Sequence, residues 1–240
     1  MTASRPPQQL PPDAPARPVR KRRWLRRILV GLAALVVFIV AAVAVTIKLQ
    51  SAPAPLALPE PAAAPVGPLD GAWRMASGSV AGFRIQQTVL GLTSDVVGRT
   101  EDVTGTVMIA GSQVVTADVR VNLLTLTSGG KPAPQFANSL DTRKYPAATL
   151  SLARPLALGA PFASGATTTV TAAAQLTLHG VTRTVTVPLS LHRDAATVEA
   201  AGTIPVSFSD WDITRPQGYG SLGSLAPGGV AEFLLVLSHS

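Results

Sequence analysis

The sequence predicts an all-β domain, a barrel or a sandwich, that follows one transmembrane helix and a Pro-rich linker. Three observations predict this order. An uncharged apolar run spans residues 28–47, six prolines fall between residues 51 and 69, and from Asp70 onward apolar and polar residues alternate. Alternation of this kind is typical of strands with one buried and one solvated face.

The apolar run from Ile28 to Ile47 contains no charged residue. A bilayer is crossed by about 20 apolar residues in a helix, so the run is long enough for a membrane anchor. Residues 17–27 before it are strongly basic, and Trp24 lies among the arginines. Basic residues flanking a span stay on the cytoplasmic side. We therefore expect a single-pass cell-membrane protein with its N-terminus in the cytoplasm and its C-terminal domain outside it.

A cleaved signal peptide is the alternative for the same segment, because Ala42-Val43-Ala44 has the small-x-small form of a cleavage site. The apolar part of a signal peptide is typically about 7–15 residues long, shorter than this run. The anchor is the preferred interpretation, and secretion after cleavage stays open.

The net charge of +7 comes entirely from residues 1–27, which hold eight basic residues and one acidic residue. The remainder is balanced, so we expect no nucleic-acid partner, which would require a basic patch on a folded face. Four segments are predicted: a disordered basic cytosolic tail (1–27), a transmembrane helix (28–47), a Pro/Ala-rich linker (48–69) and a β-barrel domain (70–240). Dense proline favours extended polyproline II, so the linker is expected to act as a semi-rigid spacer.

Period-two alternation is clearest in Val115–Leu123, where Val119 and Val121 share the apolar face and Asp118 and Arg120 the polar one. The same pattern recurs in segments around residues 83–86, 148–152, 169–178, 184–191, 197–204 and 231–237. Turn signals such as His179-Gly180 and Gly129-Gly130 separate them. The one helix expected in the domain covers Gln135–Leu140.

Many residues on the predicted apolar faces are small, including Ala148, Ala172, Ala174 and Gly202. A barrel of about eight strands is just wide enough to be filled by side chains or to hold one small ligand. Small inward residues leave volume for a ligand, whereas large ones from opposite strands would fill it. Composition leaves both outcomes open.

Several motifs match catalytic patterns in their residues but lack the structural context that the chemistry requires. Gly218–Gly223 reads G-x-G-x-x-G but does not open a helix after a parallel strand, as a dinucleotide site requires. Ser128–Lys131 reads S-x-x-K in a glycine loop without the partner motifs of acyl-enzymes. The three histidines are far apart in sequence, Asp210 and Asp212 lack clustered partners, and there is no cysteine. We therefore expect no catalytic residues, no metal site and no enzyme.

A set of short signatures resembles the YceI-like family of exported, lipocalin-like β-barrels. They are Gly98-Arg-Thr-Glu-Asp-Val-Thr-Gly105, Lys144-Tyr-Pro146, Leu176-Thr-Leu-His-Gly-Val-Thr182 and Phe208-Ser-Asp-Trp-Asp-Ile213. The resemblance covers about residues 71–237. It implies an extended eight-stranded antiparallel barrel whose apolar interior holds a polyisoprenoid chain or a quinone-like lipid, without enzymatic activity. The chain departs from the family at residues 128–135, which lack an Arg-Asp pair often present there.

The resemblance and the alternation together suggest that inward-facing residues contact a lipid chain. Tyr145 is expected to place its hydroxyl at the mouth, and Phe136 and Leu140 to cap one end. The full candidate set is Phe83, Ile85, Val119, Val121, Phe136, Leu140, Tyr145, Leu150, Leu152, Leu176, Val185, Val187, Phe208 and Phe233.

The expected function is that of a membrane-anchored extracytoplasmic lipid-binding protein. Its partners would be the lipid and the membrane, through residues 28–47, and a homodimer stays open. The alternative is a cell-envelope interaction or structural module with a filled barrel and no small-molecule ligand.

Overall fold

A computed structural model describes residues 27, 29–41, 52–216 and 223–240. The chain divides into two compact units, residues 1–50 and 51–240. Most of the predicted cytosolic tail (1–27), part of the predicted transmembrane run (28 and 42–47) and most of the G-x-G-x-x-G motif (218–222) lie outside the described residues.

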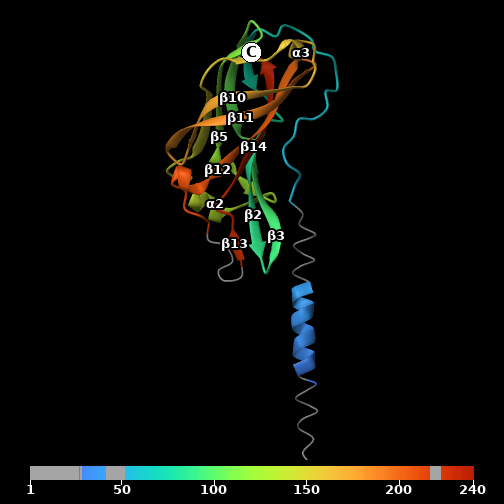
Figure 1. The fold of residues 1–240 in the computed structure, drawn as a ribbon, viewed down its shortest axis with the longest axis vertical. Coiled ribbons are helices and arrows are strands. Elements are labelled where there is room, and N and C mark those ends of the chain that lie inside the picture. The colour runs from blue at the N-terminus through green and yellow to red at the C-terminus, as the bar shows by residue number, and fades with distance from the viewer. Residues whose placement is uncertain (1–26, 28, 42–51, 217–222) are drawn as a thin grey trace, which may run out of the picture. The chain divides into compact units, whose positions relative to one another are not determined.

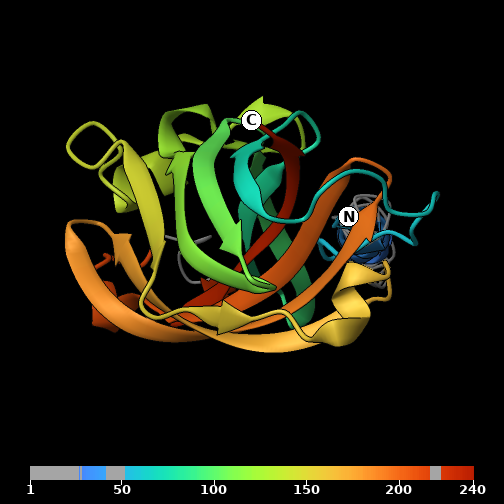
Figure 2. The ribbon, with the colours of Figure 1, turned by 90° about the horizontal axis from the view of Figure 1, so that it is seen from above.

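The second unit is a closed antiparallel barrel of eight strands (Figure 1). Seen from above, its strands curve around a common axis (Figure 2). β1 pairs with both β4 and β14, which closes the ring. In ring order the strands are β1 (Gly71–Met75), β4 (Val103–Ala110), β5 (Gln113–Asn122), β8 (Ala147–Leu152), β10 (Thr168–Leu178), β11 (Val181–Asp194), β12 (Thr197–Ser207) and β14 (Gly228–His239). The expected eight-stranded antiparallel barrel is thus confirmed.

The register agrees with the alternation in the sequence. Val119 on β5 pairs with Leu150 on β8, and Ala174 on β10 pairs with Val185 on β11, so apolar residues of neighbouring strands share the inner face. The hairpin between β10 and β11 turns at His179-Gly180, whose φ values are 52° and 78°. Two residues with positive φ make the tight turn that matches the twist of paired strands.

A hairpin outside the closed ring extends one end of the barrel. β2 (Val80–Val89) and β3 (Leu92–Thr100) form it, and β2 pairs with residues 230–234 of β14. β14 therefore pairs with β1 near its C-terminal end and with β2 in its N-terminal half. Short strands complete the sheet: β6 (Thr127–Ser128), β7 (Lys131–Pro132), β9 (Leu156–Ala157) and β13 (Gly223–Leu225).

Helical turns lie at both ends of the barrel. The predicted helix is present as α2 (Pro134–Ser139), with proline in its first turn, and η1 (Leu123–Thr125) precedes it. Three helical elements were not expected from the sequence: η1, α3 (Ala160–Ala163) and η2 (Phe208–Trp211). Asp210 lies in η2 and Asp212 directly after it, and Asp212 has a φ of 51°.

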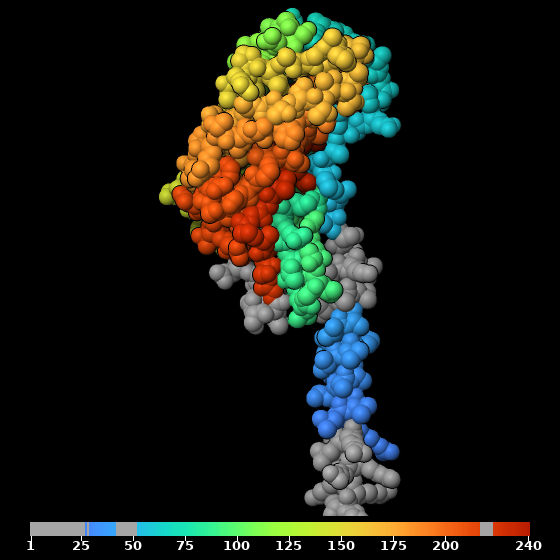
Figure 3. Space-filling model, viewed as in Figure 1, coloured from blue at the N-terminus to red at the C-terminus, as the bar shows by residue number. Residues whose placement is uncertain are grey.

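The proline-rich residues 52–69, here called the strap, are hydrogen-bonded to the outside of the barrel. Arg84 donates to the Pro53 carbonyl at 2.7 Å, and the Ala63 amide donates to Asp194 at 2.7 Å. Arg193 donates to the Gly67 carbonyl at 2.9 Å. Figure 3 shows the strap, in cyan, lying against the barrel surface. The sequence predicts a semi-rigid spacer over residues 48–69, whereas carbonyls and amides of the described residues 52–69 have partners on the barrel.

A buried ion cluster fixes the start of the strap. The carboxylate of Glu232 on β14 is only 2% exposed and lies 2.9 Å from Arg99 on β3 and 3.5 Å from Arg84 on β2. It also accepts a hydrogen bond from the Leu56 amide at 3.4 Å, and Arg99 donates to the Ala54 carbonyl. A buried carboxylate needs such charged and hydrogen-bonding partners to offset its lost hydration.

In the first unit, residues 29–41 are helical and their large apolar side chains are exposed, with Leu29 at 63% and Phe38 at 72%. Among the described residues, no helix reaches the length and hydropathy required for a bilayer span.

Candidate functional site

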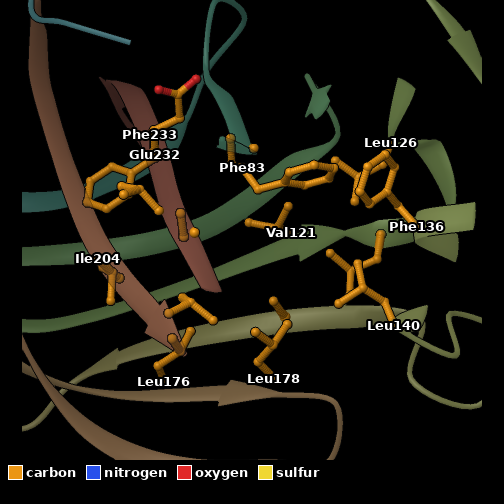
Figure 4. Close-up of a pocket in the computed structure, with 18 of the residues that line it drawn as sticks. Phe83, Val121, Leu126, Phe136, Leu140, Leu176, Leu178, Ile204, Glu232 and Phe233 are labelled. Atoms are coloured by element: carbon orange, nitrogen blue, oxygen red, sulfur yellow. The ribbon is translucent and has the colours of Figure 1, made fainter. Parts of the chain in front are cut away.

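The interior of the barrel contains an apolar cavity of about 150 Å³ (Figure 4). Ten inward-facing or capping residues of the candidate set line it: Phe83, Ile85, Val119, Val121, Phe136, Leu140, Leu150, Leu176, Phe208 and Phe233. They come from β2, β5, β8, β10, β14, α2 with the residue that follows it, and η2, elements far apart in sequence that the fold brings together.

Two glycines make room for the aromatic rings of this cavity. A Cβ on Gly98 would lie 2.4 Å from the Phe83 ring, and one on Gly202 would lie 2.6 Å from the Phe233 ring. Both separations are well below the distance at which carbon atoms make favourable contact. The positions of Phe83 and Phe233 therefore depend on glycine in the neighbouring strands β3 and β12.

Phe83 and Phe136 close the cavity at the α2 end. Their ring centroids are 4.8 Å apart with an interplanar angle of 50°, within the range of attractive aromatic pairs. Leu140 and Leu126 lie beside them in Figure 4. The predicted capping role of Phe136 and Leu140 agrees with their place on the cavity wall, although capping of a ligand stays a prediction.

A second apolar cavity of about 100 Å³ lies in the other half of the barrel. It shares Val119, Leu150, Phe233 and Leu235 with the first, so these four residues form the partition between the two. From the candidate set, Leu152 and Val187 line the second cavity only.

The only ionisable residue among the described lining residues is Glu232, and its charge is directed outward. In Figure 4 its carboxylate points away from the cavity, and its partners Arg84 and Arg99 are on the outer face. Apart from Glu232, Ser139 and Thr149, the described side chains that line the cavity are apolar. Such a surface favours an apolar ligand at about 25 cal/mol per Å² removed from water and offers no group for acid–base chemistry.

Two candidate residues do not line either cavity. Val185 packs against the main core cluster, and the Tyr145 ring stacks edge-on with His179 at 4.8 Å. A side-chain hydrogen bond with Tyr145 raises the pKa of Lys144 above its ordinary value. Tyr145 therefore belongs to a polar cluster with Lys144 and His179 beside the β10–β11 turn, and its predicted place at the mouth does not agree with this position.

Sequence reasoning omitted several lining residues from the candidate set. Leu178, Ile204 and Leu235 follow the same inward parity as their chosen neighbours, so the alternation contained the signal. Others lie in loops or helical turns, where no period exists to find them. The omitted residues include Leu123, Leu126, Leu178, Ile204, Val206, Ile213, Pro216 and Leu235.

The three histidines occupy three separate places. His179 contacts the Trp211 carbonyl at 3.0 Å, and the His239 ring lies 4.8 Å from Trp73. His192 has outward parity but is fully buried, 3.5 Å from Glu199 and next to residues that bind the strap. Within the described part of the chain, no three His, Asp or Glu side chains converge as metal ligands would.

Comparison with known proteins agrees with this architecture. No curated protein matches the sequence. A polyisoprenoid binding domain from Saccharophagus degradans, implicated in plant cell wall breakdown, is 19% identical, with a TM-score of 0.56 over 70% of this chain and 98% of that one.

Two further solved structures are less similar. BcnA from Burkholderia cenocepacia is 18% identical with a TM-score of 0.48 over 65% of this chain and 95% of that one. The YCEI protein of Campylobacter jejuni is 11% identical with a TM-score of 0.43 over 60% and 84%. The model of the YceI-like domain matches residues 73–228, which cover most of the barrel. The chain therefore belongs to the YceI-like family.

Proposed function

We propose that this protein binds a polyisoprenoid or a similar apolar lipid chain inside the barrel. The observation that carries the proposal is the pair of adjoining cavities, lined mainly by apolar side chains, along the barrel interior. Support also comes from the family and from the polyisoprenoid binding domain that shares the fold. Each buried CH₂ of a ligand contributes about 0.8 kcal/mol, so a long chain binds tightly without a polar anchor.

The size of the cavities indicates how such a chain would fit. A dry cavity of about 150 Å³ holds a molecule the size of benzene, so neither cavity alone accommodates a long prenyl chain. A chain must run through both, past Phe233 and Leu235. The Phe233 ring lies against Gly202 on β12. Because glycine has no side chain, none on Gly202 stands in the way if the ring moves aside for the chain.

The test is native mass spectrometry of the full chain purified in mild detergent, with extraction and identification of any bound lipid. Ala148 faces the first cavity, so Ala148→Phe fills it. Ala147 is the matched control, because adjacent residues of a strand point to opposite faces. We expect the Ala148→Phe protein to lose the lipid and the Ala147→Phe protein to retain it. Equal lipid content in the two variants, or a ligand-free wild type that ignores added prenyl chains, would contradict the proposal.

We propose in addition that residues 28–47 anchor the barrel to the cell membrane, outside the cytoplasm. The support is the uncharged run itself, the basic residues before it and the apolar exposure of residues 29–41. Alkaline carbonate extraction of membranes and protease accessibility in intact cells test it. Release of the intact chain by carbonate, or protection of the barrel in intact cells, would rule out this topology.

A further inference from the structure

We propose that the tip of the β2–β3 hairpin inserts into the surface of a lipid bilayer, next to the cavity at the α2 end of the barrel. This inference rests on the proposed function, because it needs residues 28–47 to lie in the membrane. It adds a second membrane contact, made by the barrel itself.

The tip exposes two large apolar side chains and contains no charged residue. Leu90 is 52% exposed and Leu92 is 43% exposed. No charged residue occurs between Arg84 and Asp95, which pair with each other at 3.1 Å at the base of the hairpin. Figure 3 shows this green hairpin projecting from one end of the barrel.

The turn chemistry of the tip is unfavourable in water. Leu90 has a φ of 51° and precedes Gly91 at 79°. Turns of this geometry favour Asn or Asp at the first position, and a bulky residue with positive φ is an outlier. The corresponding β4–β5 turn uses Gly111 and Ser112. At Leu90 the chain therefore accepts both backbone strain and solvent exposure of a large apolar side chain.

The strap determines which surface the tip can reach. Its first residues are held at Arg84 and Arg99 near the base of the hairpin, and Ala63 is held at Asp194 on the far side. The chain therefore enters the barrel unit from the hairpin end. Five residues lie between Ile47 and Pro53, and the six steps from one to the other span at most ~20 Å of chain.

The hairpin has a matching length. Leu90 is six residues beyond Arg84, about 20 Å along the strand. A barrel held at Pro53 is thus close enough to an anchor ending at Ile47 for the Leu90 tip to meet the same bilayer. Ile85, on the same strand, lines the first cavity, so this contact would bring that cavity towards the lipid.

The experiment uses the full chain in phosphatidylcholine–phosphatidylglycerol liposomes with a single environment-sensitive fluorophore. The sequence contains no cysteine, so Leu90→Cys and Val115→Cys each give one labelling site. Val115 is the control, because it is also apolar and is 41% exposed. It lies on β5, close to Gln113, which pairs with β9, and therefore away from the β2–β3 hairpin. We expect a blue shift at position 90 and quenching by a lipid-borne spin label, with neither at position 115.

Each other outcome overturns the inference. Equal quenching of both sites by aqueous iodide would show a tip in water. A blue shift at position 90 without quenching by the lipid-borne label would show that the tip contacts a second copy of the chain or another part of it. A chain that does not incorporate into liposomes would remove both the anchor and the inference, whereas bound lipid in mass spectrometry would still stand.

A second variant tests the functional consequence. Leu90→Asp combined with Leu92→Asp should slow uptake of a prenyl lipid from liposomes several-fold, with unchanged bound lipid at equilibrium and unchanged thermal stability. Uptake at the wild-type rate would contradict a role for the tip in lipid transfer.

Discussion

The two halves of the barrel are packed differently. At the α3 end, Phe162, Trp73 and Ile109 are at most 1% exposed and form a tight cluster, and the Trp73 indole donates a hydrogen bond to the Leu69 carbonyl at 2.9 Å. At the α2 end, Phe83, Leu140 and Leu178 are only partly buried and surround the larger cavity. The side chains of the α3 half are therefore more deeply buried around the smaller cavity, and those of the α2 half are partly exposed around the larger one.

The largest effect expected from this difference is on stability at the α3 end. Phe162→Ala should lower the free energy of unfolding by about 3–5 kcal/mol, because it leaves a cavity in a fully buried cluster. Chemical denaturation measures the change. A loss below about 1 kcal/mol would show that this end is as loosely packed as the other.

Phe83→Ala at the α2 end should affect lipid binding more than stability. The Phe83 ring is only partly buried, so we expect a smaller loss of stability than the ~3–5 kcal/mol typical of a fully buried aromatic ring. Lipid occupancy in native mass spectrometry should fall more than stability does. Full loss of stability with unchanged lipid content would make Phe83 an ordinary core residue.

Gly202→Ala sharpens the comparison at the partition between the halves. Its Cβ would lie 2.6 Å from Phe233 and 2.8 Å from Leu189, so the Phe233 ring must move. Overpacking of this kind costs about 1–3 kcal/mol. We expect the variant to favour shorter prenyl chains in a competition assay. Ala201→Gly, on the opposite parity, is the control and should not change the preferred length.

The smallest effect is expected in the polar cluster outside both cavities. Tyr145→Phe removes the hydroxyl that raises the pKa of Lys144, so that pKa should fall towards its ordinary value. Titration of the Lys144 side chain by NMR measures it. Because Tyr145 does not line either cavity, lipid content should stay unchanged, and a loss of lipid would restore its predicted place at the mouth.

Periodicity in the sequence predicted segments of β2, β5, β8, β10, β11, β12 and β14, because their apolar and polar residues alternate. It predicted no segment for β1, β3 or β4, although β3 has nine residues and β4 has eight. It could not place β6, β7 or β9, which are only two residues long. Periodicity also could not distinguish a residue that lines a cavity from one that only packs in the core. Val185 has the parity of Val187, but their neighbours across the barrel differ.

Docking of the strap could not be read from local sequence at all. Dense proline predicts an extended chain, which is what the strap is, but its partners are distant. Leu56 and Glu232 are 176 residues apart, and Ala63 and Asp194 are 131 apart. The same holds for Phe162, whose four-residue helix has no period and whose burial depends on the strands it covers.

The bound strap also changes how often the barrel and the bilayer meet. If residues 28–47 are in the membrane, only a handful of residues remain between the anchor and the first contact of the strap at Pro53. Short linkers give effective concentrations on the order of millimolar between the groups they join. Even a weak affinity of the barrel for lipid would then be enough to keep it at the surface, whereas release of the strap would dilute it.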